Sequence, residues 1–244
     1  MIASRALRVA LAMGAAALAG PALAGALEVT PILTDVVTDA SGATSITIRN
    51  RAASPATVQL RLLRWHLEDG EDRTEPTTVA AVSPPFITIQ PGAVHVVRIV
   101  RTSQQPIAGE EPYRLLLDEL PAPGAGNVAV SLTVRHALPV FFRSTKARPA
   151  SVRWAINDNG DGRELLAIND GDRRLRVARL RIEDKAGHVI DFGEGLAGYA
   201  LGSSERRWRL PADRAFDPAH ATVRFVSEAG PETAAAPLID RARS

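Results

Sequence analysis

The stretch "NVAVSLTVRHALPVFFR", residues 127 to 143, alternates apolar and polar side chains over its first half and then becomes solidly apolar around a proline. A two-residue period is typical of a β-strand, because an α-helix repeats only after about 3.6 residues. The apolar positions are Val128, Val130, Leu132 and Val134, and the opposite positions are Asn127, Ala129, Ser131, Thr133 and Arg135. One face of this predicted strand therefore needs an apolar partner, which is either the core of its own domain or another chain.

The first 24 residues have the pattern of an export signal. Arg5 and Arg8 precede the apolar run "VALAMGAAALAG", and Ala22 and Ala24 occupy the small-residue positions of a cleavage site. The run is shorter than the ~20 apolar residues that a membrane-spanning helix requires. We therefore expect residues 1–24 to be a signal peptide that is removed after Ala24. No later stretch is long and apolar enough to span a membrane, so we expect an exported chain without a transmembrane segment.

Charge and cysteine content narrow the possible partners. The whole chain has 29 Lys and Arg against 27 Asp and Glu, and removing Arg5 and Arg8 with the signal leaves 27 of each sign. A neutral chain lacks the basic surplus that releases counterions from nucleic acid, so we expect no nucleic-acid partner. The chain has no cysteine, so its stability must come from buried apolar surface and not from disulfides.

Most of the remaining chain is predicted to form short strands separated by turn residues. Examples are "TSITIRN", "ATVQLRLLRW" and "AVHVVRIVR" in the first half, and "VRWAIN", "RLRVARLRIED" and "ATVRFVS" in the second. The polar stretch "RSTKARPA", residues 143–150, separates the two groups. The pattern predicts an all-β chain with two antiparallel sandwich domains, residues 25–145 and residues 150–244.

Three segments resemble the periplasmic chaperones of the chaperone-usher pathway, which fold the subunits of pili and fimbriae. They are "VSPPFITIQPGAVHVVRIVR", "PYRLLLDELP" and "VSLTVRHALPVFFRSTKARP", in the order and approximate spacing of that family. The resemblance covers nearly all of the mature chain and is strongest from Val82 to Pro149. It implies two immunoglobulin-like β-sandwich domains at an angle, a periplasmic location, and a pilus subunit and an outer-membrane usher as partners.

The resemblance also implies donor-strand complementation, in which the chaperone lends a strand to a subunit whose own sandwich lacks one. Main-chain hydrogen bonds then satisfy the open edge, and alternate side chains fill the groove. On this interpretation the donated face is Val128, Val130, Leu132 and Val134. Two alternatives stay open: these side chains pack into their own core, or the chain is a secreted structural or adhesive protein with two sandwiches.

A subunit's C-terminal carboxylate is bound in this family by basic side chains in the cleft between the domains. Two of the family's basic positions align with Pro31 and Pro139, which carry no charge. This departure indicates a divergent, archaic-type branch with a different anchor. Since basic side chains can bind carboxylates, the candidates are Arg98, Arg101 and Lys146, each of which could instead be a solvated surface charge.

A bridge across the cleft is the last feature that the resemblance implies. An acid before the "YRLLLDELP" strand, an arginine that ends the donor strand and an acid late in the second domain correspond to Glu110, Arg143 and Glu228. Their expected role is to hold the angle between the domains, because an ion pair contributes little net stability unless it is well desolvated.

No motif indicates an enzyme. The segment from Asn157 opens like a calcium loop, but Ile168 stands where a bidentate glutamate belongs, so a hairpin turn is favoured. The five histidines show no metal-binding spacing, and no nucleophile or phosphate-binding motif is present. We expect no catalytic residues, no metal and no cofactor.

Overall fold

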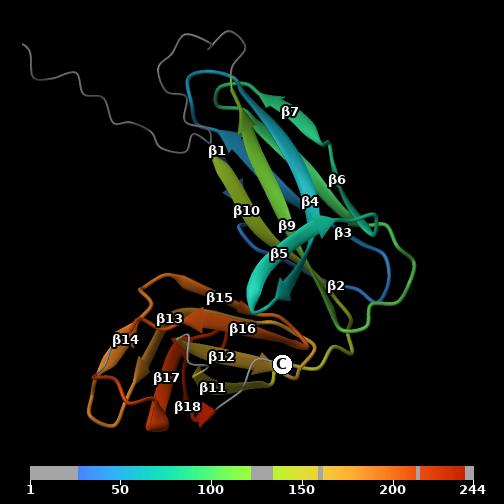
Figure 1. Cartoon of the computed structure of the whole chain (residues 1–244). Helices are drawn as coiled ribbons and strands as arrows, with labels where there is room; N and C mark the ends of the chain where they lie inside the picture. Colours follow the sequence, from blue (N-terminus) through green and yellow to red (C-terminus); the bar gives the residue numbers. More distant parts are fainter. Residues whose placement is uncertain (1–26, 122–133, 159–161, 213–214, 240–244) are drawn as a thin grey trace, which may run out of the picture.

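The structure is a computed structural model that describes residues 27–121, 134–158, 162–212 and 215–239. The predicted signal peptide and three of the predicted donor residues, Val128, Val130 and Leu132, lie outside these ranges. The described elements are all β-strands, apart from one 3-10 helix at Pro218–His220 (Figure 1). The predicted all-β class is therefore confirmed. No helix in the described ranges is long and apolar enough to cross a membrane.

The first half of the chain forms two facing sheets. One has the strand order β1-β3-β8-β6, and the other has the order β2-β10-β9-β4-β5, with β7 paired to β4. The strands are β1 (Leu27–Thr30), β2 (Thr34–Val37), β3 (Gly42–Asn50), β4 (Ala56–Glu68), β5 (Glu71–Pro76), β6 (Ala80–Ser83), β7 (Phe86–Ile89), β8 (Val94–Arg101), β9 (Glu110–Leu120) and β10 (Arg135–Arg143). Every pair in these sheets is antiparallel except β2 with β10, which is parallel.

Alternate residues of these strands fill the space between the two sheets. Val97 and Ile99 of β8 face Leu115 and Leu117 of β9, and all four are fully buried. Such alternation is what a strand with one face on a core requires, because successive side chains point to opposite faces. The inward face of each strand thus makes the core, and its outward face is left for solvent or for another domain.

The second half repeats this architecture with different strand lengths. One sheet has the order β16-β12-β11-β19, and the other has the order β14-β13-β17-β18, with β15 paired to β13. The strands are β11 (Val152–Asp158), β12 (Arg163–Asn169), β13 (Leu175–Glu183), β14 (Val189–Asp191), β15 (Leu196–Ala200), β16 (Ser204–Arg209), β17 (Ala221–Val226), β18 (Pro231–Ala236) and β19 (Leu238–Ile239). The core includes a stacked pair of indole rings, Trp154 and Trp208, whose centroids are 5.7 Å apart.

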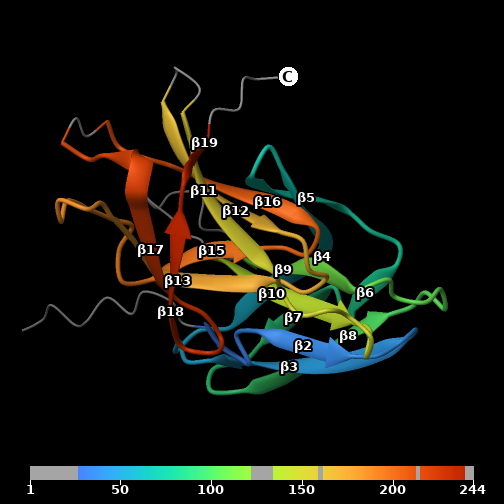
Figure 2. The same cartoon turned by 90° about the horizontal axis from the view of Figure 1, so that it is seen from below.

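The two sandwiches lie at an angle and meet at one end of each (Figure 1, Figure 2). Among the described residues, no strand of the first half pairs with a strand of the second. Contact between them includes a buried side-chain cluster of Trp65, Phe141, Tyr199 and Leu201. The predicted pair of angled immunoglobulin-like sandwiches is confirmed, and the candidate site lies where the two sandwiches meet.

Candidate functional site

Strand β10 has an edge that is only partly covered. On one side it pairs with β9 along its whole length, and on the other side β2 pairs with it only from Val140 to Arg143. The carbonyl of Val134 accepts a hydrogen bond from the N–H of Glu119, so alternate residues from Val134 onward direct their main-chain groups to β9. Arg135, Ala137 and Pro139 therefore direct theirs to the uncovered edge. Nothing in the described ranges occupies that edge.

Pro139 fits this edge because its main chain points away from β9. Proline has no N–H to donate, and within sheets it is confined to positions where no ladder bond is needed. The remaining donors of this edge in the described part of the strand are the N–H groups of Arg135 and Ala137.

The described part of the donor face points toward the first sandwich. Val134 has intermediate exposure, and the same alternation continues through Leu138, which packs against the core, to Val140 and Phe142, which are buried in it. This finding agrees with the own-core alternative for the end of the strand. Val128, Val130 and Leu132 lie outside the described ranges, so their assignment stays a prediction.

The outward face of the sheet that contains β10 lies against the second sandwich and forms the floor of the site. Trp65 of β4 is fully buried and contacts Phe141 of β10 and Tyr199 of β15, with ring centroids 5.8 Å and 5.5 Å away. Aromatic side chains from both sandwiches thus meet here. They are far apart in the sequence, so their contact could not be predicted from it. Burial raises the pKa of the Tyr199 hydroxyl, and nearby arginines only partly offset this effect.

Arg114 is the basic residue of this floor, and sequence reasoning missed it. It lies on β9 directly opposite Pro139, and residues opposite each other in an antiparallel pair share one face. Its guanidinium carbon is 3.6 Å from the centroid of the Trp65 ring. No described residue forms a hydrogen bond or an ion pair with this guanidinium. Burial lowers the pKa of Arg114, with Asp72 and Tyr199 acting in the opposite direction.

Arg206 of β16 brings a second guanidinium to the same place from the other sandwich. Its Nη1 lies 3.0 Å from the Oδ1 of Asp72 on β5, and its side chain is mostly buried. The Nε and Nη1 atoms nevertheless have no aligned hydrogen-bond acceptor. Buried donors without acceptors are costly, and the charge of this guanidinium is balanced only by the nearby carboxylate of Asp72.

The bridge between the sandwiches is built differently from the prediction. Glu110 is bound by Arg174, which immediately precedes β13: its Nη1 lies 2.5 Å from Oε2, and its main-chain N–H donates to Oε1 at 2.9 Å. Arg174 also reaches Asp35 at 3.0 Å, and Arg143 binds the other oxygen of Asp35 at 3.0 Å. Glu110 and Arg143 are therefore linked through Arg174 and Asp35, and the guanidinium of Arg174 also lies 3.6 Å from the Phe141 centroid.

Glu228 lies outside this network, which corrects its predicted role. It is exposed and accepts a hydrogen bond from the main-chain N–H of Arg176 within its own sandwich. The second sandwich contributes a cation, Arg174, where an acid was expected. Burial raises the pKa of Glu110, and the charge and hydrogen bonds of Arg174 oppose that rise.

The predicted carboxylate anchors lie in three different environments. Arg101 is only 2% exposed and donates to both oxygens of Glu111 and to the carbonyls of Ala40 and Ser103, so its guanidinium is enclosed and held within its own sandwich. This geometry contradicts its predicted role as an anchor. Arg98 is exposed, and it alternates with the core residues Val97 and Ile99, so it faces outward from the sheet that lies away from the cleft.

Lys146 is exposed in the connection between the sandwiches. Its charge acts on Asp39, whose carboxylate holds the connection by accepting hydrogen bonds from the N–H and hydroxyl of Thr145 and the hydroxyl of Ser144. These hydrogen bonds lower the pKa of Asp39. Lys146 as an anchor stays a prediction, and its local partner is already a carboxylate.

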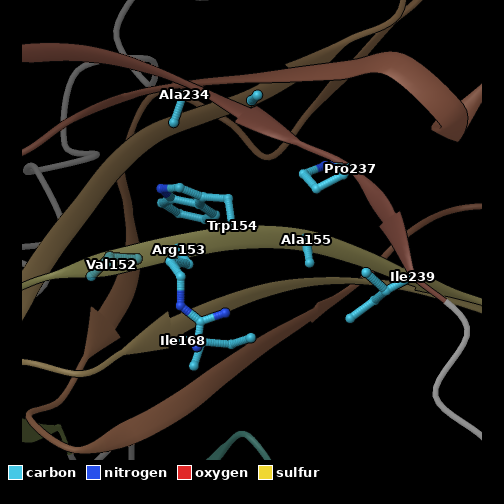
Figure 3. A pocket seen from close by; sticks show the side chains of 9 residues that line it. Val152, Arg153, Trp154, Ala155, Ile168, Ala234, Pro237 and Ile239 are labelled. Carbon is cyan, nitrogen blue, oxygen red and sulfur yellow. The ribbon is translucent and has the colours of Figure 1, made fainter.

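A separate hollow of about 470 Å³ lies in the second sandwich, between β11 and the segment β18–β19. The ring of Trp154 forms one wall, and Pro237 and Ile239 lie along its other end (Figure 3). None of its lining residues belongs to the cleft, so it is distinct from the candidate site.

Comparison with known proteins identifies the family. Residues 28–148 match the family model described as pili and flagellar-assembly chaperone, PapD N-terminal domain. The chain belongs to the pilus-assembly chaperone family. This result confirms the resemblance seen in the sequence and the predicted role of the protein as a chaperone in pilus assembly. A search of curated proteins found no match.

Solved structures share the fold of this chaperone. A chain of the CsuC–CsuE chaperone–tip adhesion subunit complex, from archaic chaperone-usher Csu pili of Acinetobacter baumannii, matches with a TM-score of 0.68 and 21% identity, covering 87% of this chain and 99% of that one. The chaperone DraB of Escherichia coli has a TM-score of 0.57 at 19% identity and covers 87% and 96%. CupB2 of Pseudomonas aeruginosa has a TM-score of 0.57 at 15% identity and covers 87% and 100%.

Proposed function

We propose that this chaperone captures a pilus subunit by adding the uncovered edge of β10, extended through Val128, Val130, Leu132 and Val134, to the open sheet of the subunit. The observation that carries the proposal is the combination of a free strand edge with an unpaired guanidinium beside its end. The edge offers main-chain groups to the subunit's last strand, and Arg114 offers its donors to the carboxylate in which that strand ends.

The strand edge would supply most of the attraction. Each buried apolar side chain of the donor face would contribute about 1.5 to 3 kcal/mol before the cost of ordering the segment is subtracted. Main-chain bonds to the edge would add affinity and fix the direction of the incoming strand. An exposed edge of this kind would otherwise invite unspecific pairing, which a bound subunit would prevent.

Arg114 would bind the carboxylate at the end of the subunit's last strand. A carboxylate that enters a partly dry cleft needs a paired cation, since an unpaired buried charge costs several kcal/mol. The bridge of Arg143, Arg174, Asp35 and Glu110 is balanced, whereas Asp72 is paired with Arg206 and acts on Arg114 only through its charge. Among these described residues there is one cation in excess, and Arg114 would replace on β9 the charge that Pro139 lacks on β10.

The edge can be tested with Ala137→Pro. This change removes an N–H that points to the uncovered edge and leaves every hydrogen bond to β9 in place, as Pro139 already does. We expect unchanged unfolding by urea and a clear loss of co-purified pilus subunit from periplasmic extracts. Ala137→Val keeps the N–H and serves as the matched control. A normal yield of subunit with Ala137→Pro would show that the edge is not used at this position.

The anchor can be tested with a double-mutant cycle. The probe is a synthetic peptide that copies the C-terminal strand of a pilus subunit co-purified with the chaperone, prepared with a free carboxylate and as an amide. Arg114→Gln should weaken binding of the carboxylate peptide by about ten- to a hundredfold, since a hydrogen bond to a charged group contributes about 1.5 to 3 kcal/mol. Binding of the amide should change little. Arg98→Gln, on the opposite sheet, is the control. Equal losses for both peptides would refute the anchor.

The wider setting follows from the family and from the predicted export signal. The chaperone would act in the periplasm, after removal of residues 1–24, and would deliver its subunit to an outer-membrane usher. The similarity to the CsuC–CsuE complex, together with Pro31 and Pro139 in place of basic residues, supports an archaic-type branch. Loss of subunit from the cell surface on deletion of a neighbouring usher gene would test the delivery step.

A further inference from the structure

We propose that Asp72 is a resident counter-ion of the carboxylate site, which limits the site to one negative charge and positions the ring on which Arg114 lies. This inference rests on the proposed function of Arg114. Asp72 belongs to the hairpin of β4 and β5, and the structure places its carboxylate between a tryptophan of one sandwich and an arginine of the other.

The first observation concerns how Asp72 is held. Its Oδ1 accepts a hydrogen bond of 2.8 Å from the Nε1 of Trp65. The indole is fully buried, and this bond satisfies its one polar atom. Because Arg114 lies over the same ring at 3.6 Å, the orientation that Asp72 gives to Trp65 also decides where the guanidinium lies. Asp72 thus acts on Arg114 as a positioning residue, through Trp65.

The second observation concerns what Asp72 does not satisfy. The Oδ1 atom is 3.0 Å from Nη1 of Arg206, but the geometry is not that of a hydrogen bond, and both Nη1 and Nε of Arg206 lack a partner. Asp72 therefore supplies charge to Arg206 without using its donors. Both atoms are enclosed, so Arg206 contributes its charge to the site and not its donors.

The charge count gives the specificity. The guanidinium groups of Arg114 and Arg206 lie near one carboxylate, that of Asp72. These three side chains together have a net charge of +1. A single terminal carboxylate neutralises it. A ligand with two carboxylates at its end would leave a net negative charge in a partly desolvated place, which is unfavourable. We therefore expect the site to prefer a strand that ends in one carboxylate to a strand that ends in an acidic residue.

A main-chain contact at the turn of the β4–β5 hairpin also holds Asp72 in place. The carbonyl of Gly70, at the turn, accepts a hydrogen bond of 3.1 Å from the N–H of Arg207 in β16, the residue next to Arg206. The position of Asp72 relative to Arg206 is thus fixed by a direct contact between the sandwiches, and it does not depend on the ion pair alone.

The decisive variant is Asp72→Asn, because an asparagine oxygen can still accept from Trp65 while the charge is removed. The probes are three forms of the peptide that copies the C-terminal strand of the co-purified subunit: a free carboxylate, an amide, and a free carboxylate form of the same length whose last residue is aspartate. Asp72→Asn should bind the carboxylate form about three- to tenfold more tightly and the aspartate form with a larger gain, with no change for the amide. Glu71→Gln, the same charge change on an exposed neighbour in β5, should change none of the three.

A charge-balance pair separates this role from a structural one. Arg206→Gln alone should weaken binding of the carboxylate peptide, and the double variant Asp72→Asn with Arg206→Gln, which restores a net charge of one, should recover part of it. Asp72→Asn with unchanged or weaker binding of the carboxylate form, or no recovery in the double variant, would overturn the inference. A wild-type protein that binds carboxylate and amide equally would instead overturn the proposed function of Arg114.

Discussion

Two arginines of strand β8 show how burial separates a structural cation from a surface cation. Arg101 is enclosed and bound to Glu111, which also accepts a hydrogen bond of 2.9 Å from the hydroxyl of Tyr113. Burial would raise the pKa of Glu111, but the hydrogen bonds from Arg101 and Tyr113 bring it below the ordinary value of 4.5. Burial and the same carboxylate raise the pKa of Tyr113 to about 12. Arg98 has no such surroundings.

Replacing Arg101 with lysine should therefore destabilise the first sandwich. Lysine cannot bind both oxygens of Glu111 and the two carbonyls at once, and breaking a buried pair typically costs about 3 to 5 kcal/mol. Arg98→Lys, three residues earlier, should stay within about 0.5 kcal/mol of wild type. Urea unfolding of both variants measures the difference. Equal stability of the two would show that the Arg101 network contributes no net free energy.

Glu111→Gln should change the response of stability to acid. The folded-state pKa of Glu111 is lowered, so its ionised form stabilises the fold above the ordinary value of 4.5, and this contribution is lost as the pH falls through the folded value. The variant should be less stable than wild type at neutral pH, and the gap should narrow toward pH 3. Urea midpoints measured across this range test the sign, and a gap that widens in acid would contradict it.

At the scale of elements, the β4–β5 hairpin depends on a glycine at its turn. Gly70 has a φ of +77°, and a Cβ built there would lie 2.2 Å from the side chain of Arg207. Gly92, in the Pro-Gly turn before β8, has a similar φ of +72° but open space around it. Both glycines have a positive φ, which favours glycine over other residues. Only Gly70 also lies against the other sandwich.

This pair gives a matched test of the hairpin contact. Gly92→Ala should cost about 1 kcal/mol of stability from backbone strain alone and leave the arrangement of the sandwiches unchanged. Gly70→Ala should cost more and move the hairpin away from β16. Small-angle scattering should then show a broader distribution of shapes for Gly70→Ala only. Identical scattering from both variants would mean that the hairpin does not hold the second sandwich.

The strands themselves were largely predictable, and the reason is the alternation. The period of two in residues 127–143 predicted a strand, and its described part is β10 with Val140 and Phe142 on the core side. Alternation does not say whether a face meets its own core or a partner, because both need the same residues. Only the pairing register showed that Ala137 and Pro139 direct their main chain to an uncovered edge.

At the scale of the whole molecule, one arginine of the second sandwich contacts three residues of the first. Arg174 binds Glu110 and Asp35 and lies on the ring of Phe141. Arg174→Gln should loosen the angle and reduce the yield of subunit, whereas Arg143→Gln, whose partner Asp35 lies in the same sandwich, should have a smaller effect. Residual dipolar couplings of the two sandwiches measure their relative order. A larger effect of Arg143→Gln would restore the bridge predicted from the family.

Two sandwiches and their family could be predicted from the sequence, but the cleft could not. Asp35 and Arg174 are 139 residues apart, and Arg114 and Arg206 lie on strands of different sandwiches, so their proximity depends on how the sandwiches meet. Pro31 and Pro139 indicated that an anchor was displaced. Locating it required the register of β9 against β10, which puts Arg114 opposite Pro139.

Pro139, which has no N–H, also limits the length of the uncovered edge that can donate hydrogen bonds. The ladder that an incoming strand can build along β10 has its last donor at Ala137, and from Val140 onward β2 already takes the place of a partner. A strand that pairs along this edge must therefore end between Ala137 and Val140, and Arg114 lies opposite that point. The chaperone would thus select the length of the subunit's last strand. A subunit lengthened or shortened by a single residue at its C-terminus would present its carboxylate out of register with Arg114.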